Sequence, residues 1–226
     1  MRLTSAVFLS LVLIVSCPAA QSDLLPPSKA NVARWEKDIA KFEAGDRQNP
    51  PPQNGILFIG SSSIRLWKTL SEDFSGLPVY NRGFGGSQIA DSLHFADRIV
   101  IPYHPRQIVM FAGSNDINAK KSPRQVFSDF IAFRERVRRE LPETRITYIA
   151  ITPCESRWKQ LAQVDETNGL IAAYCAKDSL LDFVDTRSDI LGQDGHPRKE
   201  LFRDDQLHLS PKGYEIWTRR VRPFLK

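Results

Sequence analysis

Short apolar runs alternate with amphipathic stretches along most of this chain. Five runs have the length and apolar character of strands buried on both faces: residues 55–60, 77–81, 106–113, 144–151 and 180–186. Between them apolar residues recur at helical spacing, which predicts helices over residues 28–45, 64–70, 89–99, 122–141, 163–177 and 210–223. Strands that alternate with helices predict an α/β fold, a parallel five-stranded sheet covered on both faces.

The N-terminus carries a different pattern. Arg2 precedes an apolar stretch over residues 6–15, and small residues follow as far as Ala20. This order is typical of an export signal at residues 1–20, and the stretch is shorter than the roughly 18–20 residues of a membrane span. Two alternatives stay open. Cleavage after Ala19 or Ala20 releases the protein, whereas acylation of Cys17, in a lipoprotein-like Ile-Val-Ser-Cys box, tethers it.

Both alternatives place the protein in the periplasm or outside the cell. A polar leader, the first predicted helix and the Pro-rich linker "RQNPPPQNG" then occupy residues 21–54, and the main domain occupies residues 55–226. After export, Cys154 and Cys175 remain. They either pair, as the oxidising compartment allows, or stay as two buried thiols.

Composition excludes several classes of protein. The chain has 226 residues, of which 42% are hydrophobic and 25% charged, so it can bury one sizeable core and is not globally disordered. Three cysteines exclude a disulfide-rich scaffold, and the absence of a long apolar run excludes a multi-span protein. The net charge of +5 is spread along the chain, so we expect no nucleic-acid partner.

Polar, glycine-rich clusters follow three of the predicted strands and precede the last helix. They are residues 60–63, 81–87, 113–116 and 204–208. In an open parallel sheet, ligands bind beyond the carboxyl ends of the strands, so these clusters are expected to meet at one edge. Each cluster is weak evidence alone, because glycine and serine are common in loops.

The side chains in these clusters suit acyl transfer. A serine hydroxyl becomes a nucleophile when a base takes its proton, and histidine is suited to that task. A carboxylate must orient the imidazole, and Asp205 lies three residues before His208, on the same face if the segment is turn-like. Backbone N–H groups and an Asn amide can stabilise the oxyanion of the tetrahedral intermediate.

Taken in order, "FIGSSSIRLW", "NRGFGGSQ", "AGSNDI" and "DDQLHLSPKGY" resemble the four blocks of the SGNH subgroup of GDSL hydrolases. The resemblance covers residues 55–226 and implies a flavodoxin-like three-layer α/β/α sandwich. It implies Ser62 as nucleophile, His208 as base and Asp205 as its orienting carboxylate. It also implies Ser62, Gly86 and Asn115 as oxyanion donors, with no metal and no organic cofactor.

Two further positions, Ser61 and Arg82, bear on the candidate site. Ser61 stands where the family has Asp, which leaves open which of three adjacent serines attacks; Ser62 is favoured because it lies two residues after Gly60. Arg82, inside the second block, is a candidate substrate contact.

We expect an exported serine esterase that acts on a small-molecule or carbohydrate ester. Candidate substrates are short-chain esters, carbohydrate O-acetyl groups and lysophospholipid-like esters. The alternative is a non-catalytic carbohydrate-binding or surface module on the same fold, for which Ser61 is the only support. A flavodoxin-type nucleotide binder would need its glycine loop directly after the first strand, where three serines stand.

Overall fold

The computed structural model describes residues 24–226, so the predicted export signal at residues 1–20 and its Cys17 lie outside the described residues. Five strands form one sheet in the order β2-β1-β3-β4-β5, and every neighbouring pair is parallel. Their bounds are β1 (Ile56–Gly60), β2 (Val79–Gly83), β3 (Gln107–Phe111), β4 (Arg145–Ile149) and β5 (Leu181–Val184). The predicted five-stranded parallel sheet is confirmed.

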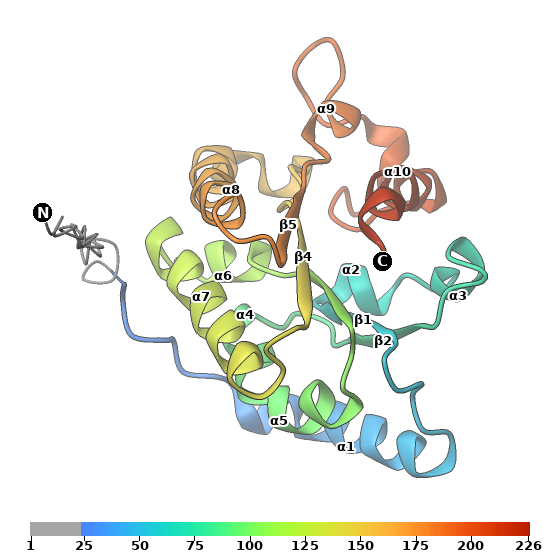
Figure 1. The fold of residues 1–226 in the computed structure, drawn as a ribbon. Helices are drawn as coiled ribbons and strands as arrows, with labels where there is room; N and C mark the ends of the chain where they lie inside the picture. Colours follow the sequence, from blue (N-terminus) through green and yellow to red (C-terminus); the bar gives the residue numbers. More distant parts are fainter. Residues whose placement is uncertain (1–23) are drawn as a thin grey trace, which may run out of the picture.

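Helices cover both faces of this sheet and make the predicted three-layer α/β/α sandwich (Figure 1). One face carries α1 (Val32–Gln48), α4 (Ile89–His94), α5 (Ala96–Ile99), α6 (Ser114–Asn118), α7 (Pro123–Glu140) and α8 (Leu161–Cys175). The opposite face carries α2 (Ser62–Arg65), α3 (Leu70–Asp73), α9 (Arg187–Ile190) and α10 (Pro211–Val221). Short 3₁₀ turns complete the connections: η1 (Ile101–Tyr103), η2 (Glu155–Gln160), η3 (Lys199–Leu201) and η4 (Arg222–Phe224).

Strands β1 and β3, at the centre of the sheet, are buried along their whole length. In β1, Leu57 and Ile59 join the core on the α1 face, whereas Ile56 and Phe58 join the core on the α10 face. Side chains of a strand point alternately to opposite faces, so one continuous apolar run serves two cores. Full burial of such a side chain contributes roughly 1.5–3 kcal/mol, and the end of β1 is therefore firmly held.

Two predicted helices are broken in the structure. The stretch that begins at Ser62 forms α2 and α3 rather than one helix, because Trp67 turns into the aromatic core. Its indole Nε1 donates a hydrogen bond to Asp73 Oδ2 at 2.6 Å. The second stretch divides into α4 and α5 at Phe95, whose ring is fully buried. Tertiary burial of one aromatic ring overrides helical periodicity in both cases.

The second strand also begins later than its apolar pattern predicts. It starts at Val79, because Pro78 has no N–H group with which to join the ladder. Pro78 does contribute its carbonyl, which accepts a hydrogen bond from Ile56 N–H at 2.9 Å. The strand also ends two residues later than predicted, at Gly83, because Arg82 and Gly83 pair with Ile59 and Gly60 of β1.

The residues before the sheet pack along the α7 face. Leu25 N–H donates to Ser128 Oγ at 3.0 Å, and Ser28 N–H donates to Asp129 Oδ1 at 2.7 Å. Helix α1 follows and is tied to α5 by Arg98, which contacts Glu36 and Glu43. The division of the chain at residue 55 stays a prediction. Among residues 24–226, no helix has the length and apolar character needed to cross a membrane.

Cys154 and Cys175 are both free and buried. Cys154 belongs to the core on the α10 face and Cys175 to the core on the α1 face. Of the two alternatives left open by the sequence, this structure has the pair of buried thiols.

Candidate active site

The chain turns sharply where β1 ends, and a glycine makes the turn. Gly60 has a φ of +136°, and a Cβ atom there would lie 1.9 Å from the carbonyl oxygen of Phe111 on β3. The next residue, Ser61, is buried and donates its N–H to that same carbonyl at 3.0 Å. This turn brings Ser62 to the first position of α2, at the carboxyl edge of the sheet.

A second turn, just before α10, holds a carboxylate against a histidine. Oδ1 of Asp205 accepts the N–H groups of Leu207 and His208, at 3.0 and 2.9 Å. Gln206, which follows Asp205, has a φ of +50°, and the backbone bends there so that the side chains of Asp205 and His208 lie on the same side of the segment. Oδ2 of Asp205 then lies 2.6 Å from Nδ1 of His208. The spacing of three residues therefore places the Asp205 carboxylate against the His208 ring.

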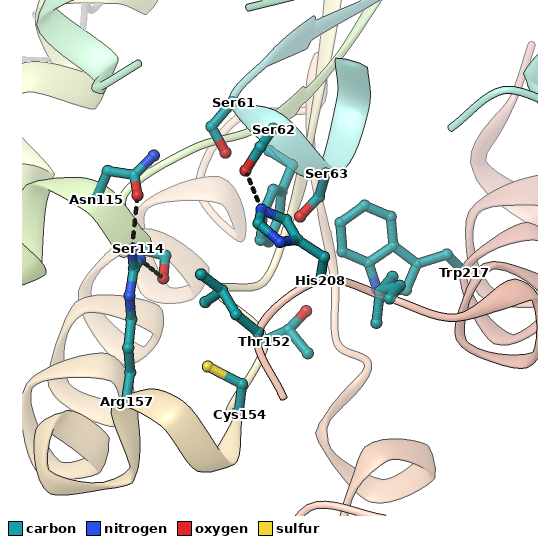
Figure 2. A pocket seen from close by; sticks show the side chains of 13 residues that line it. Ser61, Ser62, Ser63, Ser114, Asn115, Thr152, Cys154, Arg157, His208 and Trp217 are labelled. Carbon is teal, nitrogen blue, oxygen red and sulfur yellow. Dashed lines mark hydrogen bonds between the residues drawn. The ribbon is translucent and has the colours of Figure 1, made fainter. Parts of the chain in front are cut away.

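The two turns meet although 146 residues separate them along the chain: Nε2 of His208 lies 2.9 Å from Oγ of Ser62 (Figure 2). Burial opposes ionisation of Asp205, but hydrogen bonds from the His208 ring and from two backbone N–H groups outweigh it and lower the pKa of Asp205 to about 2. An ionised carboxylate beside Nδ1 favours the tautomer with its proton there. Nε2 is then free to accept the hydroxyl proton of Ser62.

Helix α6 contributes Ser114 and Asn115 to the lining of the pocket, and the loop after β2 supports that helix from behind the lining. Nδ2 of Asn115 donates to the carbonyl oxygen of Ser87 at 3.0 Å. Ser87 Oγ in turn donates to the carbonyl of Gly60 at 3.2 Å, so this loop is fastened to the end of β1. Gly86, the residue before Ser87, has a φ of +85° and lies against Arg34 and Trp35 of α1. Gly86 is not itself among the residues that line the pocket.

Asp116, the residue after Asn115, holds α6 to the elements around it. It is fully buried, accepts the N–H of Ile89 at 3.3 Å and pairs with Lys121 Nζ at 2.9 Å. Burial raises the pKa of Asp116, and the ammonium group of Lys121 opposes that rise. Lys121 also pairs with the buried Asp129 at 2.8 Å. This network joins α4, α6 and α7 under the pocket.

Arg82 is not brought to the pocket. Its guanidinium forms an ion pair with Asp46 of α1 and hydrogen-bonds to Tyr103. The physical reason is strand alternation: Tyr80 and Arg82 share the α1 face of β2, whereas the side chain of Asn81 reaches the Ile64 carbonyl on the opposite side at 2.6 Å. The expectation that Arg82 contacts substrate is not supported, and its side chain instead attaches α1 to the sheet.

The structure adds residues that the sequence motifs did not indicate. Thr152 and Cys154 follow β4 and line the pocket, and Arg157 of η2 enters it from the same loop. Arg157 Nη1 donates to Ser114 Oγ at 2.7 Å, and Nη2 donates to Asn115 Oδ1 at 2.9 Å (Figure 2). The only sequence signal for them was their place after the fourth strand of a parallel sheet, where ligands are expected.

A three-layer α/β sandwich with a pocket of serine, histidine and asparagine at the carboxyl edge of its sheet is an architecture of ester hydrolases. The chain belongs to the GDSL-like lipase/acylhydrolase family, whose family model matches residues 60–216. It is thus an enzyme, a hydrolase that acts on esters. The curated proteins contain no match.

Solved structures share the fold. A protein from Streptococcus pneumonia whose description refers to platelet activating factor superposes with a TM-score of 0.75 at 23% identity, over 86% of this chain and 94% of that one. A GDSL-like lipase from Bacteroides thetaiotaomicron superposes with a TM-score of 0.68 at 18% sequence identity, over 86% of this chain and 96% of that one. A carbohydrate esterase family 3 protein from Talaromyces cellulolyticus superposes with a TM-score of 0.59 at 16% sequence identity, over 75% of this chain and 94% of that one.

Proposed function

We propose that this enzyme hydrolyses carboxylic acyl esters through a covalent acyl-enzyme on Ser62. His208 is the general base and acid, and Asp205 orients and stabilises its ring. The observation that carries the proposal is the unbroken series of hydrogen bonds from Ser62 Oγ to His208 Nε2, at 2.9 Å, and from His208 Nδ1 to Asp205 Oδ2, at 2.6 Å. A hydroxyl, a base and an orienting carboxylate in this sequence are what acyl transfer requires.

In the proposed mechanism Ser62 Oγ bonds to the carbonyl carbon of the ester while its proton passes to His208 Nε2. The π electrons of the carbonyl move onto its oxygen, which becomes an oxyanion. Collapse of the intermediate breaks the bond to the alcohol oxygen, and His208 returns the proton to that oxygen. Water then attacks the acyl-enzyme with His208 as base again, and Ser62 regains its proton as the acid departs.

Three donors are proposed for the oxyanion: the N–H of Ser62, the N–H of Gly86 and the amide of Asn115. Ser62 is the first residue of α2, so its N–H has no acceptor within the helix. Asn115 lines the pocket, and one amide hydrogen remains after its bond to the Ser87 carbonyl. Removal of a single oxyanion donor typically lowers kcat by about 10²–10³-fold.

The pocket favours a short acyl group and a polar alcohol. Its cavity is small, about 20 Å³, and its lining mixes serine and threonine hydroxyls with Leu207, Leu209 and Trp217. We therefore propose short-chain esters and carbohydrate O-acetyl groups ahead of lysophospholipid-like esters. A substrate panel of acetylated sugars, p-nitrophenyl esters of increasing length and lysolipids tests this order. Faster turnover of the long-chain substrates than of the acetates contradicts it.

Substitution of the three adjacent serines tests the nucleophile. Ser62→Ala should lower the kcat of p-nitrophenyl acetate hydrolysis by several orders of magnitude. Loss of a triad serine can lower kcat by a factor on the order of 10⁶. Ser61→Ala and Ser63→Ala are matched controls, because both side chains are buried beside Ser62 and neither lies within hydrogen-bonding distance of His208. They should stay within about tenfold of wild type, a much smaller loss than removal of a triad member causes.

A fluorophosphonate probe gives a second readout for the same variants. It should label wild type, Ser61→Ala and Ser63→Ala at Ser62, identified by peptide mass, and leave Ser62→Ala unlabelled. Equal turnover in Ser62→Ala and wild type contradicts the assignment. Absence of any adduct in wild type, with sugar binding retained, supports the non-catalytic carbohydrate-binding module instead.

We further propose that the protein is exported by residues 1–20, either released or tethered through Cys17. This proposal rests on the sequence pattern of those residues alone. The mass of the mature N-terminus separates the two forms, because an acylated Cys17 adds lipid and a cleaved chain begins after Ala19 or Ala20. An unprocessed chain that starts at Met1 in the cytoplasmic fraction contradicts export.

A further inference from the structure

Arg157 lines the pocket and has no acidic partner among residues 24–226. It is half-buried, and none of the ion pairs within residues 24–226 includes it. Its two terminal nitrogens instead donate to neutral oxygens, Ser114 Oγ at 2.7 Å and Asn115 Oδ1 at 2.9 Å. Burial lowers the pKa of Arg157, which is the mark of a positive charge removed from water without a neighbouring carboxylate.

This arrangement fixes which way the Asn115 side chain faces. An amide has an oxygen that only accepts and a nitrogen that only donates, so the guanidinium can face Oδ1 but not Nδ2. Figure 2 shows the amide oxygen on the side of Arg157 and the nitrogen on the side away from it. The Ser87 carbonyl takes one hydrogen of Nδ2, and the other remains for a ligand.

We propose that Arg157 is a positioning residue for the oxyanion hole. It holds the Asn115 amide with its N–H toward the reacting carbonyl, and its charge polarises that amide toward the oxyanion. The inference rests on the proposed function, since it assigns a role to Arg157 through Asn115. Four segments would then build the hole: the start of α2, the loop after β2, α6 and η2.

The absence of a carboxylate partner in the part of the chain that the structure describes fits this role. A buried carboxylate next to Arg157 would neutralise it before the reaction begins. An unpaired guanidinium instead gains its counter-charge only when the ester carbonyl becomes an oxyanion, so its contribution is larger in the transition state than in the ground state. Arg157 should therefore affect kcat much more than KM.

Variants at four positions test the inference. Arg157→Met removes the charge and both donors while keeping length, and should lower kcat about 10–100-fold, up to the loss expected for an oxyanion donor, with KM changed by less than about threefold. Arg157→Lys should recover part of that loss, because one donor and the charge return. Lys159→Met is the matched control, since Lys159 is exposed on the same turn η2, and it should leave kcat unchanged.

A double-mutant cycle with Asn115→Ala then separates positioning from an independent effect. If Arg157 acts through Asn115, adding Arg157→Met to Asn115→Ala should cost less than about threefold more. Ser114→Ala, which removes only the other partner of the guanidinium, should lower kcat less than Arg157→Met does. Thermal unfolding of each variant confirms folding, and Arg157→Gln replaces Arg157→Met in the cycle if the latter does not fold.

Several outcomes would overturn the inference. Losses that multiply in the double variant mean that Arg157 acts independently of Asn115. A loss confined to KM, seen only for esters that carry a carboxylate or phosphate, means that Arg157 binds an anionic substrate group. If the fluorophosphonate labels wild type and Arg157→Met at equal rates, this inference fails while the proposed function stands. If wild type neither turns over esters nor accepts the probe, both fail.

Discussion

The two carboxylate oxygens of Asp205 make different contacts, one with the backbone of the turn and one with the ring of His208. Oδ1 closes the turn by accepting two backbone N–H groups, and Oδ2 faces the ring of His208. Asn in its place keeps one acceptor oxygen but loses the charge that, in the proposed mechanism, stabilises the imidazolium. We expect Asp205→Asn to fold and to lower kcat by up to about 10⁴-fold, the size found when a triad Asp is replaced by Asn. Steady-state kinetics on a short-chain ester measures this loss of kcat, with Asp204→Asn as the control.

The low pKa of Asp205 also predicts how stability depends on pH. Its pKa falls from an ordinary value of 3.8 to about 2 in the folded protein, so the folded state binds this proton less readily than the unfolded state. The resulting stabilisation is present above pH 3.8 and is lost as the pH falls toward 2. The side chain is about half exposed, so the contribution is small.

The difference in unfolding midpoint between wild type and Asp205→Asn should therefore narrow between pH 5 and pH 2.5. A difference in midpoint that stays constant over this range would mean that folding does not lower the pKa of Asp205. For catalysis the same pKa predicts that Asp205 stays charged throughout the working range, so protonation of this carboxylate should not limit activity above about pH 4.

At the scale of elements, the turn that ends β1 determines where Ser62 lies. A side chain at Gly60 would collide with the Phe111 carbonyl and require a strained φ, so Gly60→Ala should destabilise the protein by about 3 kcal/mol or more and lower activity with it. Gly169→Ala is the matched control: Gly169 lies within α8, nothing lies near its Cβ position, and alanine there should stabilise by roughly 0.5–1 kcal/mol.

Urea unfolding of the two glycine variants measures both effects on one scale. Equal stability of Gly60→Ala and wild type would mean that the end of β1 can relax without cost. A loss of stability in Gly169→Ala would instead indicate that a methyl group at position 169 disturbs a contact of α8.

Local signals predicted some elements well and others only in part. Ser122 and Ser210, each followed by proline, were predicted starts of helices, and their hydroxyls do accept the N–H groups of Gln125 and Gly213 at 3.2 and 3.4 Å. A helix start depends on a few consecutive residues, which the sequence contains. The breaks at Trp67 and Phe95 depend on distant partners in the core, which periodicity does not describe.

At the scale of the whole molecule, the sheet separates Cys154 from Cys175. Burial raises the pKa of Cys175 to about 12 and also raises that of Cys154, so both should be unreactive thiols in the folded protein. We expect neither to be alkylated under native conditions and both to be alkylated in denaturant without reductant, as measured by peptide mass. Thermal unfolding should not change with reductant. Recovery of a Cys154–Cys175 linked peptide would contradict the arrangement of the two cores.

The sheet also brings remote residues together. Ser62, Asn115 and His208 follow β1, β3 and β5 respectively, and parallel strands end at one edge, so their meeting could be expected from the order of elements and motifs alone. The amino-acid sequence by itself determined the parallel α/β architecture, the edge of the sheet at which the candidate site lies and the proximity of Asp205 to His208, because each depends on periodicity or on neighbours a few residues apart.

Only the tertiary structure decided the remaining features: that Arg82 attaches α1 instead of entering the pocket, that the two thiols lie on opposite faces, and that Arg157 faces Asn115. Each depends on which of two faces a side chain joins and on the path of a loop. Those outcomes are set by packing between segments far apart in the chain, which no local pattern encodes.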